Sequence, residues 1–282
     1  MYRFTVAILL VALVTGCATS PTGRRQLMLV SEQSAISQSK QAYVQTMGKL
    51  SSEGKLVTDP QILKRVDTIT GRLIAQAIIM RPATNQWEWS VQVIDDPKEV
   101  NAWCMAGGRM ALYTGLLQKI DPTDDELAQV MGHEISHALA NHTAERMSVA
   151  MASQLGALAV GVASDSAAGM AAAQGTAMVA ITLPNSRTSE TEADRIGIEL
   201  AAKAGYDPRA AATLWQKMGK VGGSGPPRFL STHPAPGNRQ ATLAALEAQM
   251  MPYYEQPGAR PMYQLVRAPV PPPAKKNAPA LR

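Results

Sequence analysis

The chain has 282 residues, of which 46% are hydrophobic and 17% are charged, and its formal net charge is +5. This apolar content is sufficient for a hydrophobic core, which excludes a disordered protein. Aromatic residues make up only 5% of the chain and its basic residues form no dense stripe, so we expect no nucleic-acid partner.

Residues 1–16 predict a secretory signal peptide. Arg3 provides a positive start, an apolar stretch covers residues 4–14, and small residues precede Cys17. The apolar stretch is too short to span a bilayer comfortably, which favours a cleaved signal over a transmembrane helix.

The run "VTGC", residues 14–17, resembles a bacterial lipobox, in which the chain is cut before a cysteine that then carries lipid. The alternative is an ordinary signal peptide with an incidental cysteine. Ala18 follows the cysteine, as in Gram-negative lipoproteins of the outer membrane. We therefore expect lipidation of Cys17, with residues 17–30 as a tether on the periplasmic face of the outer membrane.

Two helices and a small sheet are predicted next. The helices cover residues 31–50 and 59–80, and Pro60 takes the first helical position of the second one. In "WEWSVQV", residues 87–93, apolar and polar side chains alternate strictly, which predicts a half-buried strand. The apolar arms on either side of Gly107-Gly108 predict a β-hairpin.

The next predicted helix, residues 121–147, contains the candidate metal ligands and catalytic base, and a capping box marks its start. His133 and His137 are four residues apart, so they lie on one face with about 5 to 6 Å between their Cβ atoms. Two imidazoles in this arrangement can bind one Zn²⁺. Glu134 lies beside them, close enough to take a proton from a water, which is the mechanism behind the H-E-x-x-H pattern.

A third ligand has to come from another segment. His142 lies about 140° round the helix from the second motif histidine, so we read it as a surface histidine or as one that supports the site. Another predicted helix, residues 186–204, offers Glu190 and Asp194, of which one can bind the metal while the other orients a ligating imidazole. Glu192 is expected to point to a different face.

The remaining segments are less regular. Residues 148–183 are rich in Ala, Gly, Val and Met and form two arms that are short for membrane spans, which favours a flexible lid or surface-seeking hairpin. A Gly/Pro loop covers residues 222–237 and a final helix reaches about residue 251. We expect the folded domain to be residues 31–252, followed by a disordered proline-rich tail at 253–282.

Five segments resemble a known family. They are "SPTGRRQLMLVSE", "NAWCMAGGRMALYTGLL", "DDELAQVMGHEISHALANH", "SRTSETEADRIG" and "THPAPGNR". Over residues 21–251 the sequence resembles the zinc metallopeptidase family of CAAX prenyl protease type, in particular its soluble bacterial lipoproteins of the LoiP and BepA group. The fold this implies is α+β and gluzincin-like: mostly helical, with a small antiparallel sheet and an active-site helix.

The same resemblance implies roles for individual residues. One Zn²⁺ per chain would be held by His133, His137 and Glu190. Glu134 would be the catalytic base, and Asp194 would support a ligand. An extended peptide substrate could add to the edge of the sheet through main-chain hydrogen bonds. The residues expected to bind it are Asn101, Ala102 and Trp103.

His233 is the fourth histidine and lies in the Gly/Pro loop, where Pro234 favours an extended conformation for it. Two roles are open for it. It could stabilise the oxyanion of the tetrahedral intermediate, or it could bind zinc in the resting enzyme and silence the site. We favour the blocking role, because an envelope protease without a pro-segment needs a restraint. Arg239 on the following helix is expected to assist.

These features predict a zinc-dependent endopeptidase of the bacterial cell envelope that hydrolyses misfolded or misassembled envelope and outer-membrane proteins. The expected partners are those substrates, the membrane through Cys17, and the outer-membrane assembly machinery. The alternative is a chaperone or scaffold lipoprotein with an occluded or regulatory zinc site. Glu134 argues against a purely structural site, which needs no base. A sugar or lipid hydrolase has no supporting motif.

Overall fold

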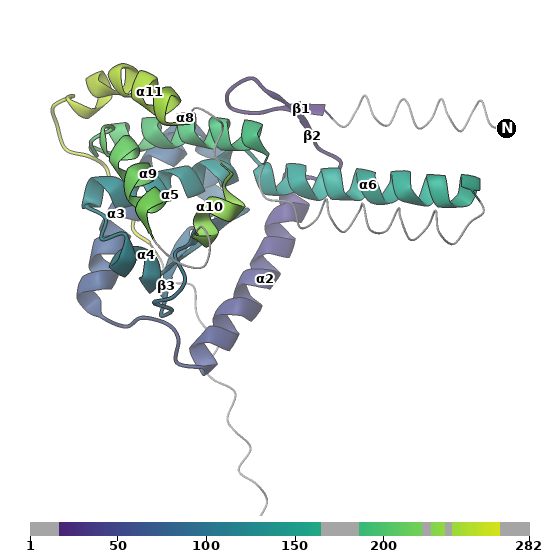
Figure 1. Ribbon diagram of the computed structural model, residues 1–282, viewed down its shortest axis with the longest axis horizontal. Helices are drawn as coiled ribbons and strands as arrows, with labels where there is room; N and C mark the ends of the chain where they lie inside the picture. The colour runs from purple at the N-terminus through teal and green to yellow at the C-terminus, as the bar shows by residue number, and fades with distance from the viewer. Residues whose placement is uncertain (1–16, 165–185, 222–226, 235–238, 266–282) are drawn as a thin grey trace, which may run out of the picture.

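The computed structural model describes residues 17–164, 186–221, 227–234 and 239–265, and Figure 1 shows their arrangement. The strands are β1 (Cys17–Thr19), β2 (Arg25–Leu27), β3 (Ser90–Ile94), β4 (Ala102–Met105) and β5 (Arg109–Tyr113). The helices are α2 (Glu32–Ser52), α3 (Pro60–Met80), α4 (Thr114–Lys119), α5 (Asp124–Leu139), α6 (His142–Ser164), α8 (Arg187–Lys203), α9 (Ala210–Lys220), α10 (Arg228–Thr232) and α11 (Arg239–Tyr254), with a 3-10 turn, η1, at Pro82–Gln86.

Side-chain caps set the starts of the long helices. Each cap accepts a hydrogen bond from a backbone N–H of the first turn, which would otherwise lack a partner. The capping residues are Ser31, Asp59, Thr123 and Ser186. The predicted capping box of α5 is complete, since the Glu126 carboxylate accepts the Thr123 N–H in return. The helices predicted at 31–50, 59–80 and 186–204 are confirmed to within two residues.

The three-stranded sheet has the order β3-β5-β4. β4 and β5 form the predicted hairpin, and Gly107 and Gly108 at its turn have φ of +83° and +80°, which glycine adopts without strain. β3 runs parallel to β5, so the sheet is mixed where we expected only antiparallel strands. β3 is also buried along its whole length rather than on one face, because α3 covers one side and α2 packs on the other.

Helix α5 is the centre of the molecule. It packs against α3, α8, α9 and β4, and nearly all of its side chains are buried. Helices and a small sheet thus surround one active-site helix, which confirms the predicted α+β class. In the described part of the chain, no helix combines the length and the apolar character that a membrane span requires.

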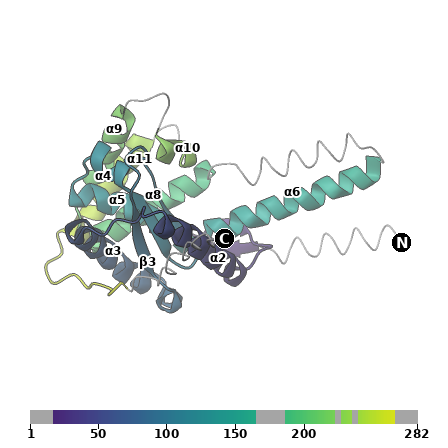
Figure 2. The same ribbon diagram turned by 90° about the horizontal axis from the view of Figure 1, so that it is seen from below.

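The helix predicted at 121–147 is in fact two helices. α5 ends at Leu139, and Asn141 adopts a φ of +56°, a left-handed conformation that asparagine tolerates better than most residues. α6 then begins at His142 and extends away from the body of the molecule (Figures 1 and 2). The first arm of the predicted hairpin at 148–183 is therefore helical to residue 164, and residues 165–183 lie outside the described residues.

The segment predicted as a tether, residues 17–30, packs against the domain instead. β1 and β2 pair as a short antiparallel hairpin. The buried side-chain amide of Gln26 donates a hydrogen bond of 2.7 Å to the carbonyl oxygen of Ala140, at the end of α5. Residues 17–27, which we call the N-terminal hairpin, therefore belong to the folded domain, whereas lipidation of Cys17 stays a prediction.

Two further segments are more ordered than predicted. The loop expected at 222–237 contains the short helix α10. The tail expected from residue 253 begins with the last residues of α11, and residues 255–265 then return across α3, where the Tyr263 N–H donates to the Gly71 carbonyl oxygen at 2.9 Å. Tyr263 and Leu265 also pack on the main core, which supplies the apolar contacts that a disordered tail would lack. Residues 266–282 lie outside the described residues.

Candidate functional site

The candidate site lies where α5 crosses α8. Gly132 and Gly197 face each other there: a Cβ added to Gly132 would lie 2.9 Å from the Gly197 carbonyl oxygen, and one on Gly197 would lie 2.8 Å from the backbone nitrogen of His133. Only glycine leaves room for such a close approach of two backbones. The crossing brings carboxylates of α8 onto histidines of α5. Our reading of the sequence missed these glycines, although both adjoin the motifs.

Four buried side chains from three segments converge at this crossing, and one ligand atom of each lies within 4.8 Å of the others. They are His133, His137, Glu190 and His233. His133 Nε2 lies 3.1 Å from His137 Nε2 and 3.2 Å from His233 Nδ1. The Glu190 oxygens lie 3.3 Å from His133 Nε2, 3.4 Å from His137 Nε2 and 3.1 Å from His233 Nδ1.

This donor set fits one Zn²⁺. Four tetrahedral ligands at zinc–nitrogen and zinc–oxygen distances place their donor atoms about 3.3 to 3.5 Å apart. Five of the six pairs of residues in the cluster have donor atoms 3.1 to 3.4 Å apart, and the sixth pair, His137 and His233, lies within 4.8 Å. Imidazole nitrogens and a carboxylate oxygen are also the donors that zinc accepts. The structure thus brings the three predicted ligands together and adds His233 as a fourth.

The charges of the cluster suit a metal centre. Burial alone would raise the pKa of Glu190, but hydrogen bonds from the three histidines hold it well below its usual range, so the carboxylate stays ionised. Burial lowers the pKa of His137 well below its usual value. Burial also lowers the pKa of His133, but hydrogen bonds to Asp194 and Glu190 outweigh this and raise it to about 9. A bound cation would compete with that proton.

Asp194 and Arg239 lie behind the cluster, in contact with its ligands. Asp194 Oδ1 is 3.0 Å from His133 Nδ1, which directs the opposite ring nitrogen to the centre. Arg239 Nη2 donates to Asp194 Oδ1 at 2.5 Å and to Glu190 Oε2 at 3.4 Å. Its guanidinium also stacks 3.5 Å from the ring centroid of Trp215. Both residues therefore lie directly behind the ligands, and their supporting roles stay predictions.

His142 is buried, not on the surface. Its exposed fraction is 1%, and its Nδ1 lies 2.7 Å from Nδ1 of His137. The 140° offset would hold on a continuous helix, but the break at Asn141 turns His142 back toward α5. Of the two readings that the sequence left open, only the supporting one is compatible with this position.

Glu134 differs from the ligands because one of its side-chain oxygens has no hydrogen-bond partner among the described residues. It is 2% exposed, and its Oε1 accepts no hydrogen bond within the described residues, although His233 Nε2 lies 3.4 Å away. Burial is the largest cause of its raised pKa. Cys104 of β4 is a free, buried cysteine whose thiol pKa is raised by burial and by the Glu134 charge. A buried carboxylate with a free oxygen is suited to accept a proton from water.

β4 is the edge strand of the sheet next to α5. The Asn101 side-chain oxygen accepts the Ala102 N–H at 3.0 Å, which shapes the start of this strand. Within the described residues no further strand pairs with its outer edge. Asn101, Ala102 and Trp103 are therefore placed where an extended peptide could add, and their role in substrate binding stays a prediction.

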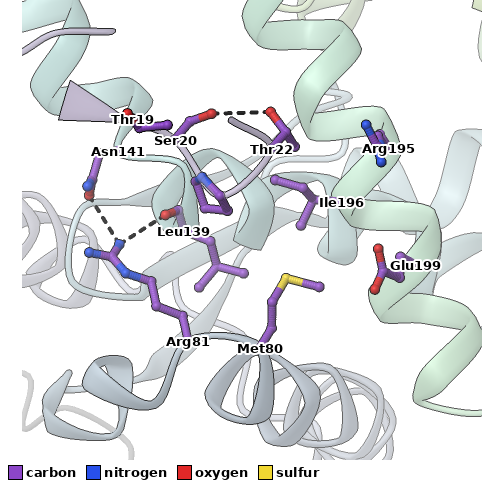
Figure 3. Close-up of a pocket in the computed structure, with 11 residues that line it drawn as sticks. Thr19, Ser20, Thr22, Met80, Arg81, Leu139, Asn141, Arg195, Ile196 and Glu199 are labelled. Carbon is purple, nitrogen blue, oxygen red and sulfur yellow. Dashed lines mark hydrogen bonds between the residues drawn. The ribbon is translucent and has the colours of Figure 1, made fainter. Parts of the chain in front are cut away.

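A pocket of about 460 Å³ lies away from the cluster, between the N-terminal hairpin, the end of α3 and α8 (Figure 3). None of the four clustered residues lines it. Arg81 projects across its floor and donates to the Leu139 carbonyl oxygen at 2.9 Å and to the Asn141 side chain at 3.4 Å. This arginine satisfies the end of α5 and holds the break between the two helices, which is a structural role.

Comparisons with known proteins agree with this geometry. Residues 60–247 match the sequence model of "Peptidase family M48". The chain is 40% identical over 172 residues to "Mitochondrial metalloendopeptidase OMA1" of Arabidopsis thaliana, covering 59% of the chain and 34% of that relative. It is 31% identical over 219 residues to "Beta-barrel assembly-enhancing protease" of Escherichia coli K12, covering 72% of the chain and 42% of that relative. The chain thus spans about a third to two fifths of these relatives.

The comparisons correct the predicted location. The N-terminus led us to expect a lipid-anchored protein of a bacterial outer membrane. The relative from A. thaliana is named a mitochondrial protein, and so is the relative from Bos taurus, which is 37% identical over 183 residues and covers 60% of the chain and 34% of its own length. A short apolar stretch followed by a cysteine carries little information about the compartment, so this pattern alone was a weak basis for predicting the location.

Proposed function

The chain belongs to peptidase family M48, and on that premise we propose that it is a zinc-dependent endopeptidase that hydrolyses unfolded or misassembled proteins. The observation that carries the proposal is the buried three-histidine, one-carboxylate cluster beside Glu134. The names of the relatives, a metalloendopeptidase and an assembly-enhancing protease, support protein substrates. The narrower resemblance to the CAAX prenyl protease type stays a prediction.

We assign the residues of the site three roles in peptide hydrolysis: metal binding, proton transfer and positioning. His133, His137 and Glu190 would hold the zinc, which as a Lewis acid polarises the scissile carbonyl and acidifies a water. Glu134 would take a proton from that water through its free Oε1 and pass it to the leaving amine. Asp194 and Arg239 keep His133 oriented throughout.

Digestion of casein by the purified chain, with and without a chelator, tests the proposal directly. We expect cleavage that stops when the metal is removed and resumes when Zn²⁺ is added back, because the proposed mechanism needs the metal to polarise the scissile carbonyl and to acidify the water. Mass spectrometry of the products should show internal cleavage, as an endopeptidase requires. Cleavage that persists after complete metal removal, or absent cleavage by the zinc-loaded chain even after His233 is replaced by alanine, would contradict the proposed function.

We further propose that His233 restrains the resting enzyme. Its Nδ1 takes a place among the ligand atoms, and its ring stacks on Phe229 at 4.5 Å between centroids. His233 is the C-terminal cap of the short helix α10, which ends at Thr232. In this arrangement His233 fills the fourth position of a tetrahedral site, which in zinc enzymes is left to water or substrate. The observation also favours the rival reading, a chaperone or scaffold with an occluded site.

His233→Ala separates these readings. If His233 is a blocking ligand, the variant should be at least as active on casein as the wild type, because the fourth position opens. Thr232→Ala is the matched control, since among the described residues the Thr232 hydroxyl bonds only to backbone oxygens of its own helix. A variant with wild-type zinc content but activity lowered about a hundredfold would instead identify an oxyanion donor. If neither the wild type nor His233→Ala cleaves casein, the result would favour the chaperone reading.

A further inference from the structure

A line of polar side chains runs from the metal centre to the N-terminal hairpin. His137 Nδ1 lies 2.7 Å from His142 Nδ1, and His142 Nε2 lies 3.1 Å from Glu192 Oε2. His137, His142 and Glu192 are each 5% exposed or less. These contacts lie on the side of His137 that faces away from the other ligands, whose atoms surround its Nε2.

The hydrogen positions along this line follow from the metal site. His137 presents Nε2 to the cluster, so Nε2 must carry the lone pair and Nδ1 the proton. That proton is donated to Nδ1 of His142, which must then be the unprotonated nitrogen of its ring. His142 Nε2 consequently carries a proton, and it meets the Glu192 carboxylate, an acceptor. Each donor meets an acceptor, and only this arrangement leaves His137 ready to bind a metal.

The N-terminal hairpin holds the far end of this line. Glu192 Oε1 accepts the Thr22 hydroxyl at 2.5 Å, and Glu192 Oε2 accepts Arg24 Nε at 2.7 Å. The remaining nitrogens of the Arg24 guanidinium donate to both oxygens of Glu145 in α6, at 2.7 and 2.6 Å. One arginine thereby joins the hairpin, α6 and α8, and the planar fork of its guanidinium fixes the direction of the Glu192 carboxylate.

We propose that His142, Glu192 and Arg24 are positioning residues for the zinc ligand His137, so that the N-terminal hairpin forms part of the support of the metal centre. The inference rests on the zinc site of the proposed function but not on peptide hydrolysis. Its physical basis is that a hydrogen-bonded partner fixes both the tautomer and the ring direction of a metal-binding histidine. Here the partner is a second histidine, itself oriented by a carboxylate that the hairpin clamps.

Zinc affinity of the full chain tests this, measured by competition with a chelator of known affinity. His142→Phe removes the acceptor while keeping a buried ring, and should weaken zinc binding about 10- to 100-fold. Glu192→Gln keeps the shape of the side chain and one acceptor oxygen, so its loss of zinc affinity should be smaller than that of His142→Phe. Arg24→Ala should also weaken binding, with partial recovery in Arg24→Lys. The absorption spectrum of the Co²⁺-loaded protein should change in the same order, since it reports ligand geometry directly.

Glu126→Gln is the matched control. Glu126 is a buried carboxylate of α5 that accepts a hydrogen bond from Lys217 at 2.7 Å. Removing its charge should destabilise the helix that carries His137, at a position that does not contact His142, Glu192 or Arg24. It should lower the melting temperature and leave zinc affinity unchanged. Zinc affinities of Glu192→Gln and Arg24→Ala within twofold of the wild type, or an equal loss in the control, would overturn the proposal even if His142→Phe does not fold. The expected zinc affinities together with absent casein cleavage by both the wild type and His233→Ala would refute the proposed function alone.

Discussion

Glu134→Gln is expected to bind one zinc per chain with wild-type affinity and to lose about 10² to 10⁴ in kcat on casein. The substitution keeps the size of the side chain and removes only its ability to accept a proton. Glu134 contributes no atom to the four-residue cluster, and its Oε1 lies free of hydrogen bonds within the described residues. Metal content measured alongside kcat separates the two roles.

Two outcomes would contradict the assignment of Glu134 as base. Retained casein hydrolysis by the pure variant would show that another group takes the proton. Loss of zinc together with activity would show that Glu134 holds the metal. Glu126→Gln again serves as a control on the same helix, because its carboxylate lies at the start of α5 and should leave kcat unchanged.

Glu190→Gln is expected to lose both zinc and activity. The Glu190 side chain is fully buried, and its oxygens face three histidine nitrogens at 3.1 to 3.4 Å. Removing its charge takes away the only anionic ligand among the four and one of the two carboxylates that face Arg239. Because a direct ligand is lost, zinc affinity should fall by more than the roughly 10- to 100-fold typical of residues that support a ligand.

Glu199→Gln is the matched control for this change. Glu199 lies on the same helix α8, pairs with Lys203 at 2.5 Å, and takes no part in the cluster. It should bind zinc and cleave casein like the wild type. Stoichiometric zinc in Glu190→Gln at wild-type affinity would contradict the ligand set, and the third ligand would then have to be sought elsewhere on α8.

Much of the site could be predicted from the sequence because it depends on local spacing. His133 and His137 share a face of α5 by helical geometry alone, and Glu134 follows from the same motif. Caps such as Asp59 and Ser186 act within one turn of the backbone, which is why several helix starts were predicted correctly. The hairpin at Gly107-Gly108 is likewise set by its own turn residues.

Predictions were wrong where one residue changed the direction of the chain. The left-handed conformation of Asn141 ends α5 at a point where the apolar pattern continues, so the sequence favoured one long helix. The consequence is large, because the break decides whether His142 faces solvent or His137. The ordered residues 17–27 and 255–265 were missed for a related reason: their polar and proline-rich composition indicated tails, while their contacts are distant in sequence.

By itself, the sequence determined the H-E-x-x-H spacing and the capped start of the helix that carries it, since these follow from period and capping within a few residues. Spacing alone left Glu190 and Asp194 of α8 as equals, the family resemblance favoured Glu190, and the tertiary structure places Glu190 among the histidines of the cluster. That placement depends on the close crossing of α5 and α8 at Gly132 and Gly197. His233 joins the cluster from 100 residues away and Arg24 reaches Glu192 across 168, and such contacts arise only from the packing of the whole chain.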